Sequence, residues 1–179
     1  QLALSKKLKM NLWQADACSQ LGYVLATSGN AIKSYDYINE ARKLSEDKNN
    51  EADNWRPWTF SNSKNSHEAR VSILAMNCQM MANLWGYLGE SEKRKATSLE
   101  ALKWGLAINN GKVLHLAYTN IGSGTTASPD SAILFFKMSL KKAEEVGFTR
   151  IGNTYLNLAG VYARKKMLDS AVFYAHKSI

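Results

Sequence analysis

The side chains that could catalyse a reaction or bind a metal are few and widely separated in this chain. The three histidines are His67, His115 and His176. None has a second ligand at the short spacing of a metal site, so we expect surface or packing histidines and no metal. Glu144 and Glu145 follow two lysines near the end of an expected helix, where an intrahelical charge network accounts for them.

One short segment, Gly122-Ser-Gly124-Thr-Thr, has the glycine and hydroxyl residues of a phosphate-binding loop. It lacks the Gly-Lys-Ser/Thr ending of a nucleotide site, and Gly122 occupies a packing position of the repeat. We interpret the segment as a turn between helices. No Ser/His/Asp or Cys/His arrangement is suggested by spacing either. The sequence therefore predicts a protein that is not an enzyme and has no cofactor.

The two cysteines, Cys18 and Cys78, each precede an aliphatic-small step by three residues, Leu21-Gly22 and Met81-Ala82. Equivalent positions in stacked helices lie about 10 Å apart. A disulfide tolerates a Cα separation of about 7 Å at most. We expect two buried thiols, which suits a reducing compartment without excluding an oxidising one.

A ladder of small residues recurs along the sequence: Ala3, Ala41, Ala101, Ser139 and Ser178. The intervals are 38, 60, 38 and 39 residues, so one of them carries about 22 extra residues. A fixed period of this size is typical of stacked helical hairpins, none of which buries its apolar face alone. The ladder therefore favours an architecture built for recognition over one built for catalysis.

Other columns follow the same register. Small residues after aliphatic ones let first helices approach their neighbours closely: Gly22, Ala82, Gly122 and Ala159. Gly29 and Gly89 mark hairpin turns. Eight residues after the first four ladder positions stand residues that tolerate the left-handed conformation: Asn11, Asn49, Asn109 and Gly147. We expect a helix to end at each of them.

These columns resemble the tetratricopeptide repeat family, whose signature is Leu-Gly, an aromatic residue, and then small, aromatic and small residues. The resemblance covers nearly the whole sequence and is strongest from Phe136 to Ile179. The period of about 38 exceeds the usual length of about 34 and resembles the longer hairpins of many bacterial sensor and regulator proteins. In the second unit, Arg94 and Ser98 stand where small and aromatic residues are expected.

We expect an all-α fold: a right-handed α-solenoid of about four stacked antiparallel hairpins after a partial N-terminal helix, in one domain over 1–179. The expected ranges are a partial helix at 1–9, repeats at 12–46, 68–109 and 112–147, an inserted loop at 47–67, and an incomplete repeat at 150–179. Gln1 begins inside a second helix and Ile179 stops before its helix is complete. We therefore expect a piece of a longer protein.

The inserted loop is polar, rich in Asn and Ser, and has aromatic residues at its centre. Loops of this length in a compact array are uncommon and often functional. One interpretation is that Trp55, Trp58 and Phe60 pin the loop to neighbouring helices. The other is that they form, with Arg56, a lid or hook for a partner, since Trp and Arg are favoured binding anchors.

The protein has 23 basic and 15 acidic residues, a net charge of +8. The basic residues occur in small scattered groups, which favours solvated helix faces over a nucleic-acid surface. No apolar run approaches the roughly 18 residues of a membrane span, and no signal peptide is evident. We expect a soluble piece, in the bacterial cytoplasm or on the periplasmic side of a membrane-anchored protein.

First-helix positions that point away from the small-residue seam line the concave groove of such arrays. In this sequence they are Asp16, Ser19, Tyr23, Met76, Gln79, Asn83, Tyr87, Thr119, Ser123, Asn153, Leu156 and Arg164. They suit a peptide, or they are simply the solvated face of the helices. Chaperone-binding members of the family have Lys or Arg where this sequence has Ser19, Gln79 and Thr119, so we do not expect a cochaperone.

The leading hypothesis is a non-enzymatic recognition domain that binds a protein, a peptide or a downstream domain of its own polypeptide. The resemblance implies the sensory part of a bacterial histidine kinase or transcription regulator. The alternative is a scaffold for self-association, for example as a homodimer, or for assembly of a complex. Nucleic-acid binding through the basic residues is the third hypothesis, and it would weaken steeply with salt.

Overall fold

The computed structural model describes residues 1–52, 63–125 and 128–179, and the regular structure of these ranges is entirely helical. A short helix, α1 (Leu2–Lys7), precedes the hairpins. The hairpin helices are α2 (Asn11–Thr27) with α3 (Ala31–Glu46), α4 (Ser66–Tyr87) with α5 (Ser91–Ala107), α6 (Gly111–Gly124) with α7 (Pro129–Glu145), and α8 (Gly152–Arg164) with α9 (Leu168–His176). A 3-10 helix, η1 (Lys48–Ala52), follows α3.

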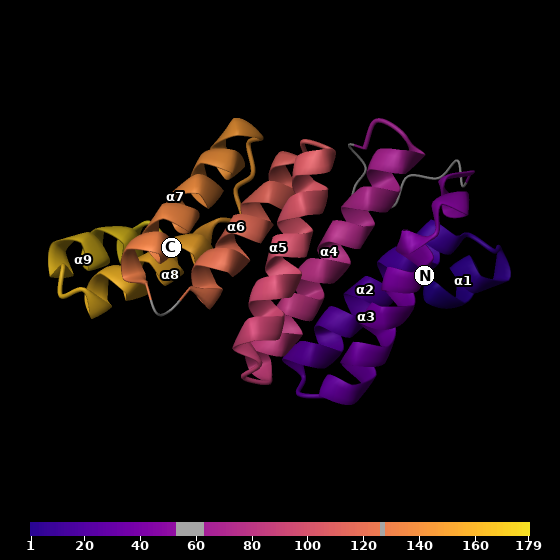
Figure 1. Ribbon diagram of the computed structural model, residues 1–179, viewed down its shortest axis with the longest axis horizontal. Helices are drawn as coiled ribbons and strands as arrows, with labels where there is room; N and C mark the ends of the chain where they lie inside the picture. The colour runs from indigo at the N-terminus through magenta and orange to yellow at the C-terminus, as the bar shows by residue number, and fades with distance from the viewer. Residues whose placement is uncertain (53–62, 126–127) are drawn as a thin grey trace. The chain divides into compact units, whose positions relative to one another are not determined.

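The molecule divides into two compact units, Gln1–Ile108 and Asn109–Ile179. Within each unit the two helices of a hairpin pack against each other, and consecutive hairpins stack, α3 and α2 on α4 in the first unit and α7 on α8 in the second (Figure 1). The prediction of an all-α fold of stacked antiparallel hairpins is confirmed. That both units form one repeat domain stays a prediction.

Three residues of the small-residue ladder are fully buried. Ala41, Ala101 and Ser139 have no exposed surface, whereas Ser178 is partly buried. The expectation for Ala3 is wrong: this residue is exposed, and the short helix α1 buries Ser5 instead.

The glycines at the aliphatic-small steps are required by close approach. A Cβ atom added to Gly22 would lie 2.5 Å from Cγ1 of Ile38, and one added to Gly122 would lie 2.9 Å from Cε1 of Phe136. Both distances are too short for nonbonded carbon atoms. Gly122 and Gly124 belong to the last turn of α6 and Thr125 caps it, so the glycines of this segment, which were interpreted as a turn between helices, are helical. The bare backbone of Gly122 leaves room for the Phe136 ring of α7.

Two of the four residues predicted to end a helix do so. Asn109 and Gly147 adopt the left-handed conformation, with φ of 47° and 62°, and Gly29 and Gly89 do so in the hairpin turns. Asn11 instead begins α2. Asn49 lies within the 3-10 helix. The left-handed residues in the first and last turns are lysines, Lys9 and Lys166, which no column of the sequence indicated.

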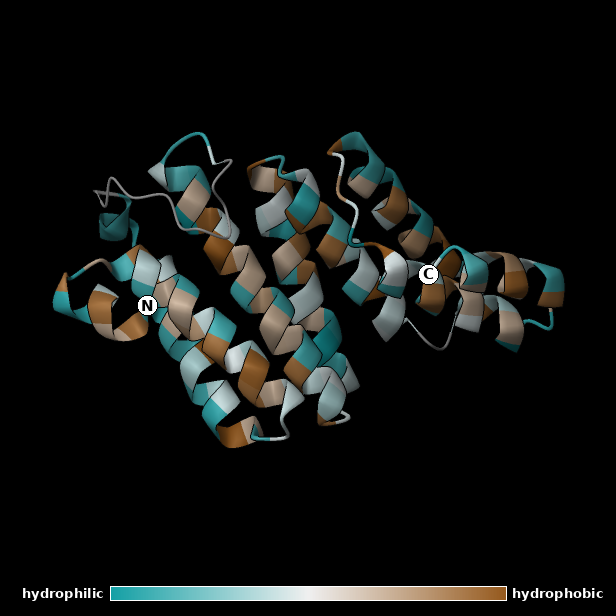
Figure 2. Cartoon of the chain, turned by 180° about the vertical axis from the view of Figure 1, so that it is seen from behind, coloured by the Kyte–Doolittle hydropathy of each residue, from teal (hydrophilic) through white to brown (hydrophobic). Residues whose placement is uncertain are grey.

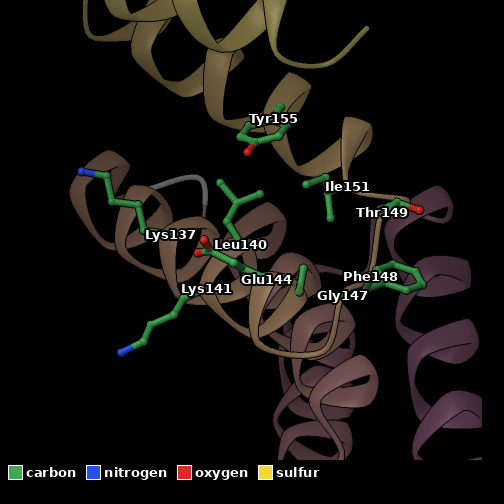
Figure 3. A pocket seen from close by; sticks show the side chains of 10 residues that line it. Lys137, Leu140, Lys141, Glu144, Gly147, Phe148, Thr149, Ile151 and Tyr155 are labelled. Carbon is green, nitrogen blue, oxygen red and sulfur yellow. The ribbon is translucent and has the colours of Figure 1, made fainter. Parts of the chain in front are cut away.

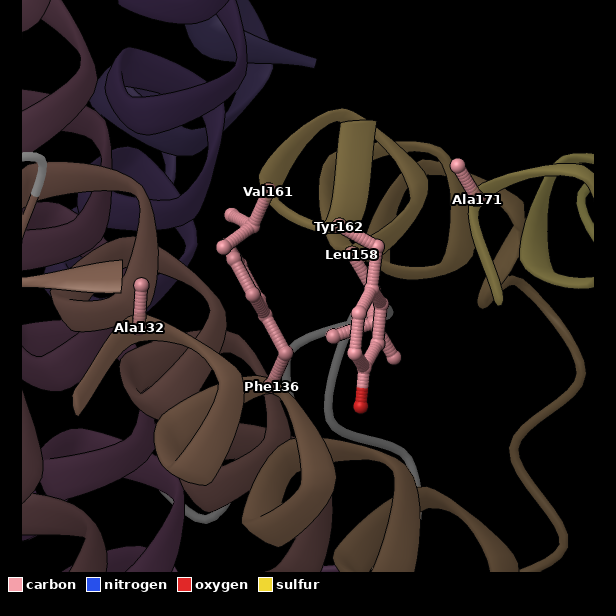
Figure 4. Close-up of a cluster of buried hydrophobic side chains, with 6 residues drawn as sticks. All are labelled: Ala132, Phe136, Leu158, Val161, Tyr162 and Ala171. Atoms are coloured by element: carbon pink, nitrogen blue, oxygen red, sulfur yellow. The ribbon is translucent and has the colours of Figure 1, made fainter. Parts of the chain in front are cut away.

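The core of the second unit is an apolar cluster of six buried residues: Ala132, Phe136, Leu158, Val161, Tyr162 and Ala171. Phe136 reaches from α7 toward Val161 of α8 (Figure 4). Hydrophobic and hydrophilic residues alternate in short groups along the helices (Figure 2). In the described ranges, none of the helices combines the length and the apolar character that a membrane crossing requires.

Candidate partner-binding surface

Three of the predicted groove residues of the first unit are buried. Asp16 is 3% exposed, Ser19 is 1% exposed and Gln79 is 3% exposed. Gln1 donates a hydrogen bond from Nε2 to Oδ2 of Asp16 over 3.3 Å. The Ser19 hydroxyl lies 3.0 Å from the carbonyl oxygen of Ala15. These side groups therefore serve the contacts between helices rather than an open surface.

Ser19 begins a polar seam, which we define as Ser19, Asn77, Ser45, Arg70 and Glu51. Its hydroxyl donates to Oδ1 of Asn77, and Nδ2 of Asn77 donates to the Ser45 hydroxyl over 3.0 Å. Arg70 donates from Nη1 to the Ser45 carbonyl over 2.6 Å and from Nε to Glu51 over 2.7 Å. This bond from Arg70 is the main reason that the pKa of the Glu51 carboxyl is lowered. The seam joins α2, α3, η1 and α4.

The polar seam also anchors the first part of the inserted loop. Asn50 is buried, and its Nδ2 donates to the Leu44 carbonyl over 2.6 Å while its Oδ1 accepts from Asn11 over 2.7 Å. His67 contacts Glu51 through Nδ1 at 2.8 Å. The predicted lid or hook residues lie outside the described residues: Trp55, Arg56, Trp58 and Phe60.

The other groove residues of the first unit are more accessible. Tyr23 is 43% exposed on α2, and Tyr87 is 66% exposed at the end of α4. Met76 and Asn83 are partly buried on α4. These residues leave two phenol rings and one amide available to a partner.

In the second unit, the predicted residues divide between a hydrogen-bond network and an open helix face. The Thr119 hydroxyl lies 2.7 Å from the Ser139 hydroxyl and 3.0 Å from that of Thr154, between α6, α7 and α8. Ser123 accepts a hydrogen bond of 3.3 Å from Asn157. These contacts give Thr119 and Ser123 structural roles.

Asn153, Leu156 and Arg164 are exposed along one face of α8, and Leu156 is 58% exposed. Gly160 lies on the same face, between Leu156 and Arg164. A Cβ atom added to Gly160 would meet only Nη1 of Arg164, at 3.9 Å. Packing therefore does not require this glycine, although glycine costs a helix about 1 kcal/mol relative to alanine. We name this surface, Asn153, Leu156, Gly160 and Arg164, the α8 face.

A hollow of about 690 Å³ lies between α7, α8 and the loop that joins them, and the sequence did not indicate it. Leu140, Ile151 and Tyr155 point into it, whereas Lys137 and Lys141 extend outward (Figure 3). The signal available in the sequence was the spacing of Lys137, Leu140, Lys141 and Glu144 along one face of α7. That spacing alone indicates only a solvated helix face.

His115, Cys18 and Cys78, which were considered for catalysis or metal binding, are buried. His115 is 2% exposed, and its Nδ1 lies 3.1 Å from the Ser139 carbonyl. Desolvation lowers the pKa of His115, and this hydrogen bond opposes the effect. Cys18 and Cys78 are free, buried thiols, as predicted, and burial raises the pKa of each to about 12. No cluster of three His, Cys, Asp or Glu residues suited to a metal occurs in the described ranges.

One ion pair belongs to the intrahelical charge network that was predicted around Glu144 and Glu145. Lys142 pairs with Glu145 within α7 over 2.7 Å. Between α3 and α5, Arg42 donates from Nη1 and Nη2 to Glu100 over 3.1 and 2.6 Å. This bidentate pair links α3 to α5.

Comparison with known proteins gives a fold likeness and no sequence family. A scan against protein-family models gave no match, and neither did a search of curated proteins. Among solved structures, the protein is similar to the apo form of RapI, with a TM-score of 0.70 and 17% sequence identity. The match covers 92% of this sequence and 54% of RapI, so the sequence spans about half the length of that protein. The likeness shows a helical-repeat fold.

Proposed function

We propose that this protein is a non-enzymatic recognition domain that binds a protein or peptide segment, either from another molecule or from its own polypeptide. The first helices of its hairpins would form the binding surface. The observation that carries the proposal is the α8 face, where Leu156 is exposed and Gly160 leaves the backbone bare. A bare helix backbone permits close approach of a second polypeptide backbone.

The α8 face combines the groups that peptide recognition uses. The Asn153 amide can donate to and accept from a peptide backbone, Leu156 can contact an apolar residue, and Arg164 can pair with a carboxylate. Tyr23 and Tyr87 offer exposed phenol rings in the first unit. Tyrosine is enriched among residues that dominate binding energy because its ring is large and has few rotatable bonds.

We further propose that the fold is a long-period variant of the tetratricopeptide repeat. We also propose that the protein is the sensory or regulatory part of a bacterial signalling protein, such as a histidine kinase or transcription regulator. The recurrence of the ladder at 38 or 39 residues in three of four intervals supports the first statement. The likeness to a protein described in its apo form, the state without a ligand, supports a ligand-binding role.

The test is to pan a phage-displayed peptide library on the purified protein and to measure the affinity of selected peptides for variants. Leu156→Ala and Asn153→Ala should weaken binding about tenfold, which corresponds to about 1.4 kcal/mol. The melting temperature should change no more than for the control Leu134→Ala, an exposed leucine on α7. Equal affinity of all variants would exclude the α8 face, and failure to select any peptide would count against the function.

A second candidate function, self-association as a scaffold, is favoured by the outer face of α9. Leu168, Val172 and Phe173 are 66%, 56% and 54% exposed on this short helix. Val172 stands in the same column as Ile133, which packs against the apolar cluster of the second unit. Size-exclusion chromatography with light scattering should then show a dimer for the wild-type protein and a monomer for Val172→Glu. A monomeric wild-type protein at high concentration would exclude this function.

A further inference from the structure

The second hairpin has an arginine where the other hairpins have a small residue. The positions seven residues before the ladder are Ser34, Arg94, Ala132 and Ala171. The three small residues are buried in the contact with their first helices, and Ala171 is the most exposed of them at 9%. Arg94 is partly buried. Because burying a cation without a partner costs free energy, an arginine at this position requires its own explanation.

Gly86 provides the room for the arginine. A Cβ atom added to Gly86 would lie 3.2 Å from Nη1 of Arg94 and 3.3 Å from its Cδ and Cζ. The guanidinium group therefore rests against the bare backbone of α4. Tyr87, the next residue along that helix, is 66% exposed. The arginine thus lies against the end of α4 that carries the exposed Tyr87.

Arg94 has no acidic partner in the part of the protein that the structure describes. Its Nε is buried and finds no hydrogen-bond acceptor there. Glu90, one helical turn earlier, pairs instead with Lys93 at 3.4 Å. Burial lowers the pKa of Arg94, and Tyr87 opposes the effect. The charge of this guanidinium is therefore available to an anion from outside the hairpin.

We propose that Arg94 binds a carboxylate of the recognised segment through its Nη groups, with the Tyr87 hydroxyl as a second donor. The planar guanidinium offers parallel N–H groups that match the two oxygens of a carboxylate. The neighbouring cation, Lys93, pairs with Glu90, and its Nζ lies 4.9 Å from the centre of the Trp85 ring. Among the described residues, Arg94 therefore contributes the one free positive charge of the proposed site, which matches a ligand group with a single negative charge.

This inference rests on the proposed function, since the carboxylate belongs to the protein or peptide that the domain recognises. The group is either an Asp or Glu residue or the free C-terminus of a polypeptide. Arg94 lies on the second helix of its hairpin. Its second donor, Tyr87, is one of the predicted groove residues on the first helix. The site nevertheless differs from Ser19, Gln79 and Thr119, the first-helix positions that lack a cation.

NMR of the ¹⁵N-labelled protein detects the Nε–H signal of Arg94. This signal is assigned by its absence from the spectrum of Arg94→Lys. Sodium acetate should shift this signal saturably, whereas sodium chloride at equal ionic strength should not. The signal of the exposed Arg150, which belongs to neither proposed surface, is the internal control. Absence of an acetate-specific shift, or tighter saturation by inorganic phosphate, overturns the proposal.

Two peptides then identify the source of the carboxylate. Acetyl-Gly-Glu-Gly-amide offers only the carboxylate of the glutamate, and acetyl-Gly-Gly-Gly with a free C-terminus offers only a terminal carboxylate. At least one should shift the Arg94 signal, with affinity about tenfold weaker for Arg94→Lys as judged by the Tyr87 signals, because lysine lacks the planar fork. If neither peptide binds, the proposal is wrong.

Arg94→Ala restores the residue type of the column and separates binding from packing. It should melt at the same temperature as the wild-type protein in chloride, or higher, and it should lose the stabilisation that acetate gives the wild type. A lower melting temperature in chloride, with no acetate dependence in the wild type, would make Arg94 a packing residue. If a library-selected peptide binds Arg94→Ala unchanged, the function stands and this site fails. If acetate binds at Arg94 but no peptide can be selected from the library, the anion site is supported and the proposed recognition function is wrong.

Discussion

The polar seam of the first unit and the apolar cluster of the second unit hold neighbouring helices together by different means. In the seam, Ser19, Asn77 and Ser45 exchange hydrogen bonds inside the contacts between α2, α3 and α4. In the cluster, Phe136, Leu158 and Val161 fill the same kind of space with hydrocarbon. Both regions belong to hairpins that share one register, so the repeat does not dictate how its interfaces are stabilised.

The difference concerns specificity. Apolar packing depends on volume and tolerates exchange among residues of similar size, whereas a hydrogen bond depends on direction and fails when one partner is removed. The seam ties the inserted loop to its hairpins because Glu51 bonds to Arg70, and Asn50 bonds to the adjacent end of α3. We therefore expect the polar seam to be sensitive to single polar substitutions and the apolar cluster to loss of volume.

The largest expected effect is in the apolar cluster. Phe136→Ala should lower the free energy of unfolding by about 3–5 kcal/mol, because the ring is 1% exposed and faces the bare backbone of Gly122. Urea denaturation followed by circular dichroism measures the change. The control is Phe173→Ala on α9, where the ring is 54% exposed. Equal losses for the two variants would contradict the role of the cluster.

A smaller effect is expected in the polar seam. Asn77→Ala removes one hydrogen-bond partner from each of two buried hydroxyls, which keep the carbonyls of Ala15 and Ala41 as acceptors, and should cost about 1 kcal/mol. The triple variant Ser19→Ala, Ser45→Ala and Asn77→Leu should lose less than Asn77→Ala alone, because apolar groups then replace all the partners and leucine fills the space of Asn77. Asn153→Ala, an exposed amide on α8, is the control. A larger loss in the triple variant would mean that shape, not satisfied hydrogen bonds, stabilises the seam.

The smallest effect depends on pH and concerns the polar contacts of the second unit. His115 has a lowered pKa, so below its usual value of 6.5 the unfolded protein binds a proton that the folded protein does not. Stability from this residue is therefore complete above that pH and falls as the pH drops below it. Melting temperatures at pH 8 and pH 5.5 measure the loss.

Two variants isolate the contribution of His115. His115→Gln should reduce the difference between the two pH values, whereas His67→Gln, an exposed histidine beside Glu51, should leave most of it. A pH dependence that is unchanged in His115→Gln would assign the effect to other groups.

The helices were predictable because their determinants are local. Apolar periodicity and the turn glycines Gly29 and Gly89 place the hairpins within a few residues of the observed bounds. The left-handed Lys9 and Lys166 were not predictable, because lysine has no intrinsic preference for that conformation. Their conformation follows from the short turns between helices that pack tightly together.

The accessibility of the residues proposed for binding was predictable only in part. Helical spacing correctly places Tyr23, Tyr87 and Leu156 on accessible surface. It also selects Asp16, Ser19 and Gln79, which are buried, because periodicity identifies a face of a helix but not which neighbour covers that face. The partner residue Asn77 of the seam, which is 1% exposed, had no distinguishing signal in the sequence.

The sequence by itself determined the repeat: the spacing of Ala41, Ala101 and Ser139, and the glycines that permit close approach, depend on residue size and helical period. The tertiary structure alone decided which polar residues face a neighbouring helix and which face solvent. Arg94 illustrates the division. Its departure from the small-residue column is visible in the sequence. That the guanidinium lies against Gly86 without a carboxylate partner among the described residues follows only from how α4 and α5 pack.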